Sequence, residues 1–214
     1  MAVALIVAAG RGERLGSGRP KALVTLAGKP MLEWSVDAVR GLVDAIVVAL
    51  PAEELDTAPA GTTAVAGGAA RSHSVRAALA ASGEDDPVVV HDAARPLATA
   101  RLFSRALEEL ERSRADAVIA ARPIADTVKE TRGATVTRTL DRSVLWGVQT
   151  PQVFRRQALE RALQREDLLE MATDEAWLVE QQGGEVRVID SEEHNFKVTT
   201  ERDLELAELL LSLR

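Results

Sequence analysis

The chain has 214 residues, 46% of them hydrophobic and 28% charged, which is the composition of a folded domain and excludes a disordered chain. Cysteine is absent, so disulfides, thiolate metal sites and cysteine nucleophiles are excluded, and a reducing compartment is favoured. A net charge of −7 and an aromatic content of 3% argue against nucleic-acid binding, and no apolar stretch is long enough for a bilayer, so we expect a cytoplasmic protein that binds neither nucleic acid nor membrane.

Short apolar runs alternate with segments of helical period through the first half of the chain. This order is typical of a mainly parallel sheet with crossover helices. The predicted strands are Val3–Ala8, Ala45–Leu50, Thr63–Ala66, Val88–His91 and Ala117–Ala121. The predicted helices between them are Pro30–Arg40, Arg71–Ala81 and Thr99–Arg114, with Thr99 as an N-cap.

The segment from Asp126 to Arg142 interrupts this rhythm. Its β-prone runs Thr127–Glu130 and Thr135–Thr139 flank a turn at Arg132 and Gly133, which predicts a projecting hairpin. Helical period resumes afterwards, and no interdomain linker is visible, so we predict one domain over residues 1–214. The remaining predicted elements are helices Arg155–Glu170, Thr173–Gln182 and Thr200–Leu213, and a strand Glu185–Ile189.

A loop rich in glycine and in cations, AAGRGERLGSGRPK, follows the first predicted strand. Its glycines permit tight turns and leave backbone N–H groups free for phosphate, and its cations can neutralise several adjacent negative charges. The Walker pattern is absent. The GxGxxxG spacing lacks an acidic ribose partner after the second strand, so an oxidoreductase is only the alternative to a nucleoside triphosphate site. The residues concerned are Gly10, Gly12, Gly16, Gly18, Arg11, Arg14, Arg19 and Lys21.

Polar residues also follow the strand Val88–His91, at the end where open α/β sheets bind ligands. Asp92 could hold Mg²⁺ or substrate, or it could cap a turn and pair with Arg95, and we interpret His91 as structural. Near the carboxyl terminus, Lys197 is a single cation in an acidic segment, which hints at a directed role. The histidines are too widely spaced for a zinc site, so any metal is expected to be Mg²⁺ on carboxylate and phosphate oxygens.

The motifs AAGRGERLG with PK, GGAARSHSV, HDAARP, DTVK, DRSVLW, QTPQVF, TDEA and NFKVT, taken in this order, resemble the 2-C-methyl-D-erythritol 4-phosphate cytidylyltransferases of the non-mevalonate isoprenoid pathway. The resemblance covers nearly the whole chain. It implies a three-layer α/β/α Rossmann-like nucleotidyltransferase fold with a mainly parallel sheet and a projecting β-hairpin arm. It also implies transfer of CMP from CTP to methylerythritol phosphate with release of pyrophosphate. Ribitol 5-phosphate cytidylyltransferases share the scaffold and are the nearest alternative.

The resemblance also implies residue roles. Arg14, Lys21 and Lys197 would be the catalytic cations, with Mg²⁺ on the triphosphate oxygens. The arm, residues 123–145, would cross to a partner subunit in a homodimer. The CTP-binding residues implied are Ala8, Ala9, Gly10, Arg11, Gly12, Gly67, Gly68, Arg71 and Ser74, and those for the acceptor are Asp92, Arg95, Thr127, Arg142, Thr150 and Thr173. Departures from the family pattern stand at Ala22, Ala69 and Phe196.

Overall fold

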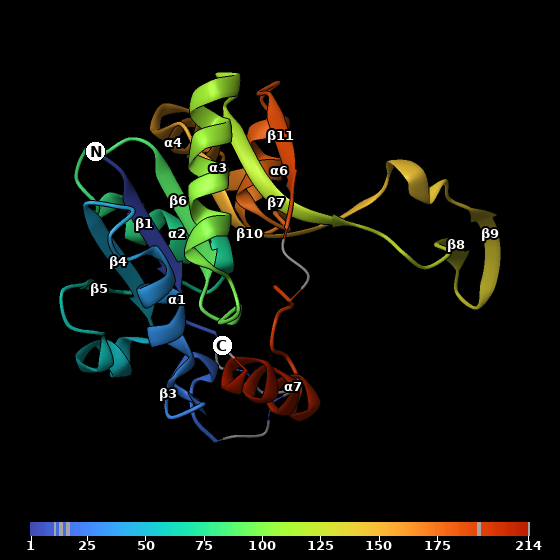
Figure 1. Ribbon diagram of the computed structural model, residues 1–214. Coiled ribbons are helices and arrows are strands. Elements are labelled where there is room, and N and C mark those ends of the chain that lie inside the picture. Colours follow the sequence, from blue (N-terminus) through green and yellow to red (C-terminus); the bar gives the residue numbers. More distant parts are fainter. Residues whose placement is uncertain (11, 13–14, 16–17, 192–193, 214) are drawn as a thin grey trace.

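A seven-stranded sheet forms the centre of the computed structural model, which describes residues 1–10, 12, 15, 18–191 and 194–213 (Figure 1). The strand order is β11-β7-β10-β6-β1-β4-β5. Of the neighbouring pairs described, the two that involve β10 are antiparallel and the others are parallel. The strands are β1 (Val3–Val7), β4 (Ala45–Leu50), β5 (Thr63–Ala66), β6 (Val88–Asp92), β7 (Ala117–Pro123), β10 (Trp146–Phe154) and β11 (Val186–Asp190).

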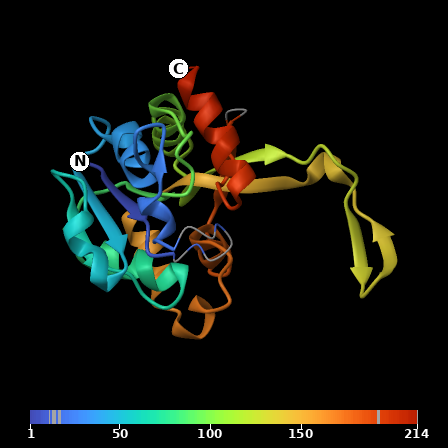
Figure 2. The same cartoon turned by 90° about the horizontal axis from the view of Figure 1, so that it is seen from below.

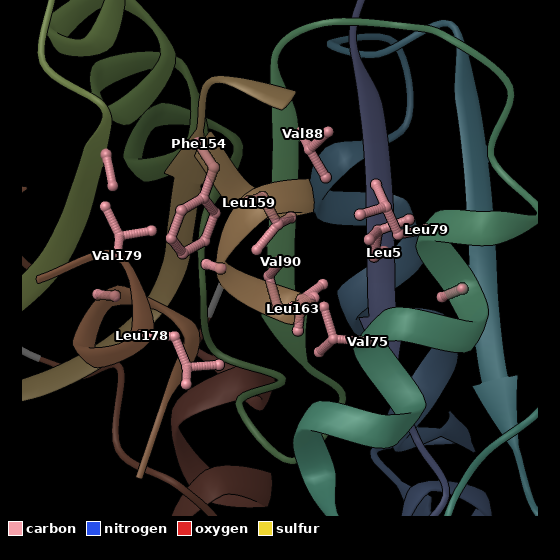
Figure 3. Packing of buried hydrophobic residues seen from close by; sticks show 14 of the residues in the cluster. Leu5, Val75, Leu79, Val88, Val90, Phe154, Leu159, Leu163, Leu178 and Val179 are labelled. Atoms are coloured by element: carbon pink, nitrogen blue, oxygen red, sulfur yellow. The ribbon is translucent and has the colours of Figure 1, made fainter. Parts of the chain in front are cut away.

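Helices cover both faces of the sheet, which confirms the three-layer fold. Because successive strand side chains alternate in direction, Val3 and Leu5 of β1 join one hydrophobic cluster while Ala4 and Ile6 join the other. Figure 3 shows part of the first cluster, in which Phe154 packs among aliphatic side chains. The first face carries α2 (Arg71–Ala80), α4 (Arg156–Leu163) and α6 (Glu175–Glu180), and the second carries α1 (Met31–Val39) and α3 (Ala100–Ser113).

The predicted strands and helices are confirmed with one exception, and three strands were not predicted: β10 and the two-residue strands Thr25–Leu26 and Lys29–Pro30. The sequence did not predict β10, because this strand contains Pro151 and a register shift between Val148 and Gln152 that break the apolar alternation. The single predicted helix Arg155–Glu170 is wrong. It divides into α4 and α5 (Glu166–Leu169) at Arg165, whose ψ of 74° is not helical. The break turns Leu169 back into the core, where its carbonyl accepts a 2.6 Å hydrogen bond from Ser72 Oγ.

The carboxyl-terminal helix α7 (Glu201–Ser212) closes a third, smaller hydrophobic cluster. It packs near the short hairpin of β2 (Thr25–Leu26) and β3 (Lys29–Pro30), and Thr200 forms a capping box with Asp203 at its start. The segment before α7 is tied to the turn after β6, since Val198 N donates to the Ala94 carbonyl at 2.8 Å. This contact places the segment before α7 at the same edge of the sheet as the loops after β1 and β6. Two short 3₁₀ elements, η2 (Lys21–Leu23) and η3 (Ala52–Thr57), lie at that edge.

The projecting hairpin is also confirmed. It comprises β8 (Lys129–Arg132), β9 (Thr135–Thr139) and η4 (Arg142–Val144), and it extends away from the body in both views (Figures 1 and 2). The first strand begins two residues later than predicted, and Gly133 turns the chain with a φ of +58°. Val136 and Val144 on the arm are exposed. No helix in the described part of the chain has the length and apolar character needed to span a membrane.

Candidate active site

Two adjoining cavities open at the carboxyl ends of the parallel strands. The larger has a volume of about 660 Å³ and the smaller about 310 Å³. They adjoin each other, because Gly10, Lys21 and Gly68 are among the residues that line both. Val7 pairs with Asp92 across β1 and β6, so the loops after these two strands begin at the same level and meet in the smaller cavity.

Close backbone packing forms one wall of the cavities. A Cβ on Gly67 would lie 2.3 Å from Ala9 Cβ and 2.9 Å from Ser74 Oγ, so only glycine allows the loops after β1 and β5 to approach this closely. Ser74 Oγ accepts a hydrogen bond from Gly68 N at 3.1 Å, which fixes the first turn of α2 against the same wall. The wall therefore offers small side chains and backbone polar groups instead of large side chains.

Asp92 lies in the smaller cavity between two cations. Its Oδ1 accepts from Arg71 Nε at 2.9 Å and its Oδ2 accepts from Lys197 Nζ at 2.7 Å. Burial disfavours the charged carboxylate, but the positive charges and hydrogen bonds of Arg71 and Lys197 outweigh it and hold the Asp92 pKa well below its ordinary value. Asp92 is therefore ionised at physiological pH. The alternative in which it pairs with Arg95 is wrong, because Arg95 donates instead to the Asn195 carbonyl at 2.8 Å.

Arg71 also contacts a second carboxylate. Its Nη1 donates to Oε2 of Glu175, the first residue of α6, which is fully buried. Burial alone would lower the Arg71 pKa, but the negative charges of Glu175 and Asp92 raise it above its ordinary value. Burial raises the Glu175 pKa, and the Arg71 charge opposes this effect. Two carboxylates and two cations thus form a connected group behind and within the smaller cavity.

His91 and Thr150 fix the backbone of Asp92 from behind. Burial lowers the His91 pKa to about 3, so the imidazole is neutral and carries one proton. Nε2 lies 3.3 Å from the Arg95 carbonyl, which can only accept, so Nε2 bears the hydrogen. Nδ1, 2.9 Å from Thr150 Oγ1, then accepts from that hydroxyl, and Thr150 Oγ1 accepts from Asp92 N at 3.1 Å.

A neutral buried His91 makes stability depend on acid. Between the folded pKa of about 3 and the ordinary value of 6.5, the unfolded chain binds a proton that the folded chain does not. The contribution of neutral His91 to the free energy of unfolding is therefore complete above pH 6.5 and declines as the pH falls below that value. When the pH is lowered from 7 to 5, the free energy of unfolding should fall in both proteins. We expect the decrease to be about 2 kcal/mol smaller in His91→Gln than in the unsubstituted protein. Urea unfolding at both pH values measures the difference.

The exposed His194 provides the control for this measurement. His194→Gln should keep the acid dependence of the unsubstituted protein, because its side chain is in water in both states. Parallel curves for the unsubstituted protein and His91→Gln would contradict a neutral buried imidazole.

The structure brings most of the expected site residues together. Gly67 lines the larger cavity, and Lys21, Gly10 and Gly12 line both. Thr150 and Arg95 are buried behind the smaller cavity, where Asn195 Nδ2 donates to the Thr150 carbonyl at 2.8 Å. The other expected residues that line the smaller cavity are Ala8, Ala9, Gly68, Arg71, Ser74, Asp92 and Lys197.

Other expected residues are not brought to the cavities of the same chain. Thr127 and Arg142 are exposed on the arm, where Arg142 donates to the Ala125 carbonyl. Thr173 is exposed in the loop before α6. Arg11 and Arg14 lie outside the described residues.

Glu175 and Asn195 belong to the site but were not predicted from the sequence. Both lie in segments that carried the resemblance, TDEA and NFKVT, yet neither has a distinctive spacing. The only sequence feature that marks Glu175 is its position directly after Asp174. Asp174 caps α6 by accepting from Trp177 N at 2.8 Å. That feature is indistinguishable from an ordinary acidic first helical turn.

The described residues include no cluster of three or more His, Cys, Asp or Glu side chains that could hold a metal ion. Both Asp92 oxygens already accept from cations, so the donor set does not favour this carboxylate as a Mg²⁺ ligand. The arrangement is compatible with a Mg²⁺ ion whose ligands are mainly phosphate oxygens, as is common in nucleotide-binding sites.

Comparisons with known proteins agree with this geometry. A family model described as 2-C-methyl-D-erythritol 4-phosphate cytidylyltransferase matches residues 2–213. Proteins of that name from Rhodococcus jostii and Deinococcus radiodurans are 47% and 43% identical, covering 98% and 97% of this chain and 94% and 88% of their own lengths. The crystal structure of the Thermus thermophilus protein of that name has a TM-score of 0.84 at 33% identity, covering 99% of this chain and 100% of that one.

Proposed function

The chain belongs to the 2-C-methyl-D-erythritol 4-phosphate cytidylyltransferase family, and from this membership we propose how its cavities carry out nucleotidyl transfer. CMP passes from CTP to 2-C-methyl-D-erythritol 4-phosphate, giving 4-diphosphocytidyl-2-C-methyl-D-erythritol and pyrophosphate for isoprenoid precursor synthesis. A phosphate oxygen of the acceptor bonds to the α-phosphorus while the bond to the β-phosphate breaks. The observation that carries the proposal is that Lys21 and Lys197, from opposite ends of the sequence, line one cavity beside Asp92.

Charge neutralisation is the chemistry that these residues supply. A phosphate monoester is anionic near neutral pH, so its oxygen attacks without a general base. Lys21 and Lys197 neutralise the charge that gathers on the transferring phosphorus, and by family resemblance Arg14 joins them. Mg²⁺, when bound, would add positive charge to the triphosphate, and the triphosphate oxygens would be its main ligands.

The wall of small residues is suited to a pyrimidine. By family resemblance, Ala8, Ala9, Gly67 and Gly68 would enclose the base closely enough to reject a purine by size. Their backbone groups, with Ser74 beside them, could distinguish cytosine from uracil at its exocyclic amine. Ala69, a departure from the family pattern, lines both cavities without adding a polar side chain.

The acceptor is proposed to lie on the Asp92 side. Its hydroxyls can donate to the Asp92 carboxylate. Thr150 Oγ1 holds the Asp92 backbone by accepting from its N–H, and Arg95 N donates to the Asp92 carbonyl at 2.9 Å. Thr173, Thr127 and Arg142 have no place in the cavities of the same chain. We propose that Thr127 and Arg142 reach the acceptor from a partner subunit's arm, which makes a homodimer part of the catalytic unit.

Pyrophosphate release tests the proposed function. The enzyme is incubated with methylerythritol phosphate and each of the four nucleoside triphosphates, and CTP is expected to give the highest rate. The comparisons do not favour the ribitol phosphate or oxidoreductase alternatives, and the same assay tests the first of them while a nicotinamide titration tests the second. A higher rate with ribitol 5-phosphate, or NADP(H) binding without CTP binding, would refute the proposal.

A further inference from the structure

A buried acidic residue lies behind the proposed acceptor site. The side chain of Glu175 is 1% exposed, and its Oε2 contacts Arg71 Nη1. No hydrogen-bond partner for Glu175 Oε1 is found among the residues that the structure describes. Its neighbours on α6 include Ala176, Leu178 and Val179, which are all buried and apolar. Glu175 is thus a buried carboxylate that pairs with Arg71, and the negative charges of Asp92 and Asp174 also act on it.

Stability alone does not explain this arrangement. Removing a carboxylate from water is unfavourable, and a single ion pair with an unsatisfied oxygen compensates incompletely, so a packed apolar residue would stabilise the fold at least as well. Arg71, the partner of Glu175, indicates a role in function. It lines the smaller cavity, and Nε of the same guanidinium donates to Asp92 Oδ1 at 2.9 Å. Glu175 itself does not line that cavity in the described structure.

The guanidinium of Arg71 is shared between two carboxylates. Contacts at Nη1 and Nε fix both its position and its plane, which a single contact would not do. The Glu175 charge also offsets the Arg71 charge, so Asp92 keeps negative charge for Lys197 and for donors from the acceptor. Without Glu175, Asp92 would be the carboxylate that compensates Arg71, so less of its negative charge would remain for the acceptor and the cavity that receives a triphosphate would be more positive.

We propose that Glu175 is a positioning residue for the transfer reaction, which acts by holding and neutralising Arg71 so that Asp92 is presented to the acceptor. This inference rests on the proposed function, since it assigns Asp92 to the acceptor and the cations to the phosphates. It differs from a purely structural role in what it predicts for the two substrates. Loss of the Glu175 charge should weaken binding of the acceptor and should not weaken binding of CTP.

Glu175→Gln tests this distinction, because it removes the charge while keeping the size of the side chain. At saturating CTP, kcat/KM for the acceptor is expected to fall on the order of ten- to a hundredfold. The CTP dissociation constant, measured by calorimetry, should stay the same or decrease. Glu180→Gln, an exposed substitution on the same helix, is the matched control and should leave both quantities unchanged.

A double variant tests whether Glu175 acts through Arg71, and it also restores charge balance if Glu175→Gln folds poorly. Arg71→Gln with Glu175→Gln is expected to be no less active than Arg71→Gln alone. Multiplicative losses, unchanged acceptor kinetics in Glu175→Gln, or an equal weakening of CTP binding would overturn the inference. Failure of the unsubstituted enzyme to transfer CMP would instead refute the proposed function.

Discussion

Lys197→Ala is expected to lower kcat on the order of a hundred- to a thousandfold, the loss seen when one preorganised group that stabilises a transition state is removed. Lys197 Nζ is 2.7 Å from Asp92 Oδ2, and the side chain is about half exposed, so it can turn from the carboxylate to a phosphate. The charge it neutralises is greatest while the α-phosphorus is five-coordinate. The dissociation constant for CTP should therefore change much less than kcat.

Single-turnover rates and CTP titration of the same preparation separate these two effects. Lys29→Ala is the matched control, because Lys29 pairs with the exposed Asp37 outside the cavities and surface ion pairs contribute little. It should retain the turnover of the unsubstituted enzyme. Unchanged turnover in Lys197→Ala, or equal losses in binding and turnover, would contradict the role assigned to this cation.

Arg142→Ala is expected to lower turnover on the order of a hundredfold although the residue lies outside the cavities of its own chain. If the arm serves the partner's site, mixing this variant with Lys197→Ala should recover activity. In a mixed dimer one site has both substitutions and the other has neither. Random exchange in a symmetric dimer gives mixed dimers half of the time, so about one quarter of the original sites should be intact.

The two parent variants are unfolded together, refolded and assayed against each alone. Lys21→Ala mixed with Lys197→Ala is the control, because both residues belong to the body and no combination restores a complete site. Arg138→Ala, on the arm but paired with Glu130 in the hairpin, should have little effect. If the first mixture showed no recovery although the subunits had exchanged, the proposed arm exchange would be refuted.

The identity of the elements was determined by the sequence to a large extent. Alternation and helical period predicted most strands of the sheet and the helices α1, α2, α3, α6 and α7, because these segments each carry their own apolar pattern. The strand β10 has no such pattern, since Gln149, Thr150, Pro151 and Gln152 occupy its middle. It forms because β6 and β7 leave room between them for an antiparallel partner.

The candidate cations and the family were likewise determined by the sequence, because they are carried by residue types in a fixed order along the chain. Only the tertiary structure decided which side chains meet. Glu175 reaches Arg71 across 104 residues, Lys197 reaches Asp92 across 105, and Thr150 lies between His91 and the backbone of Asp92. These contacts depend on the placement of β10 beside β6, of α6 against the sheet, and of the segment before α7 beside the turn after β6. That placement is set by packing of the whole core, which no local pattern of residues encodes.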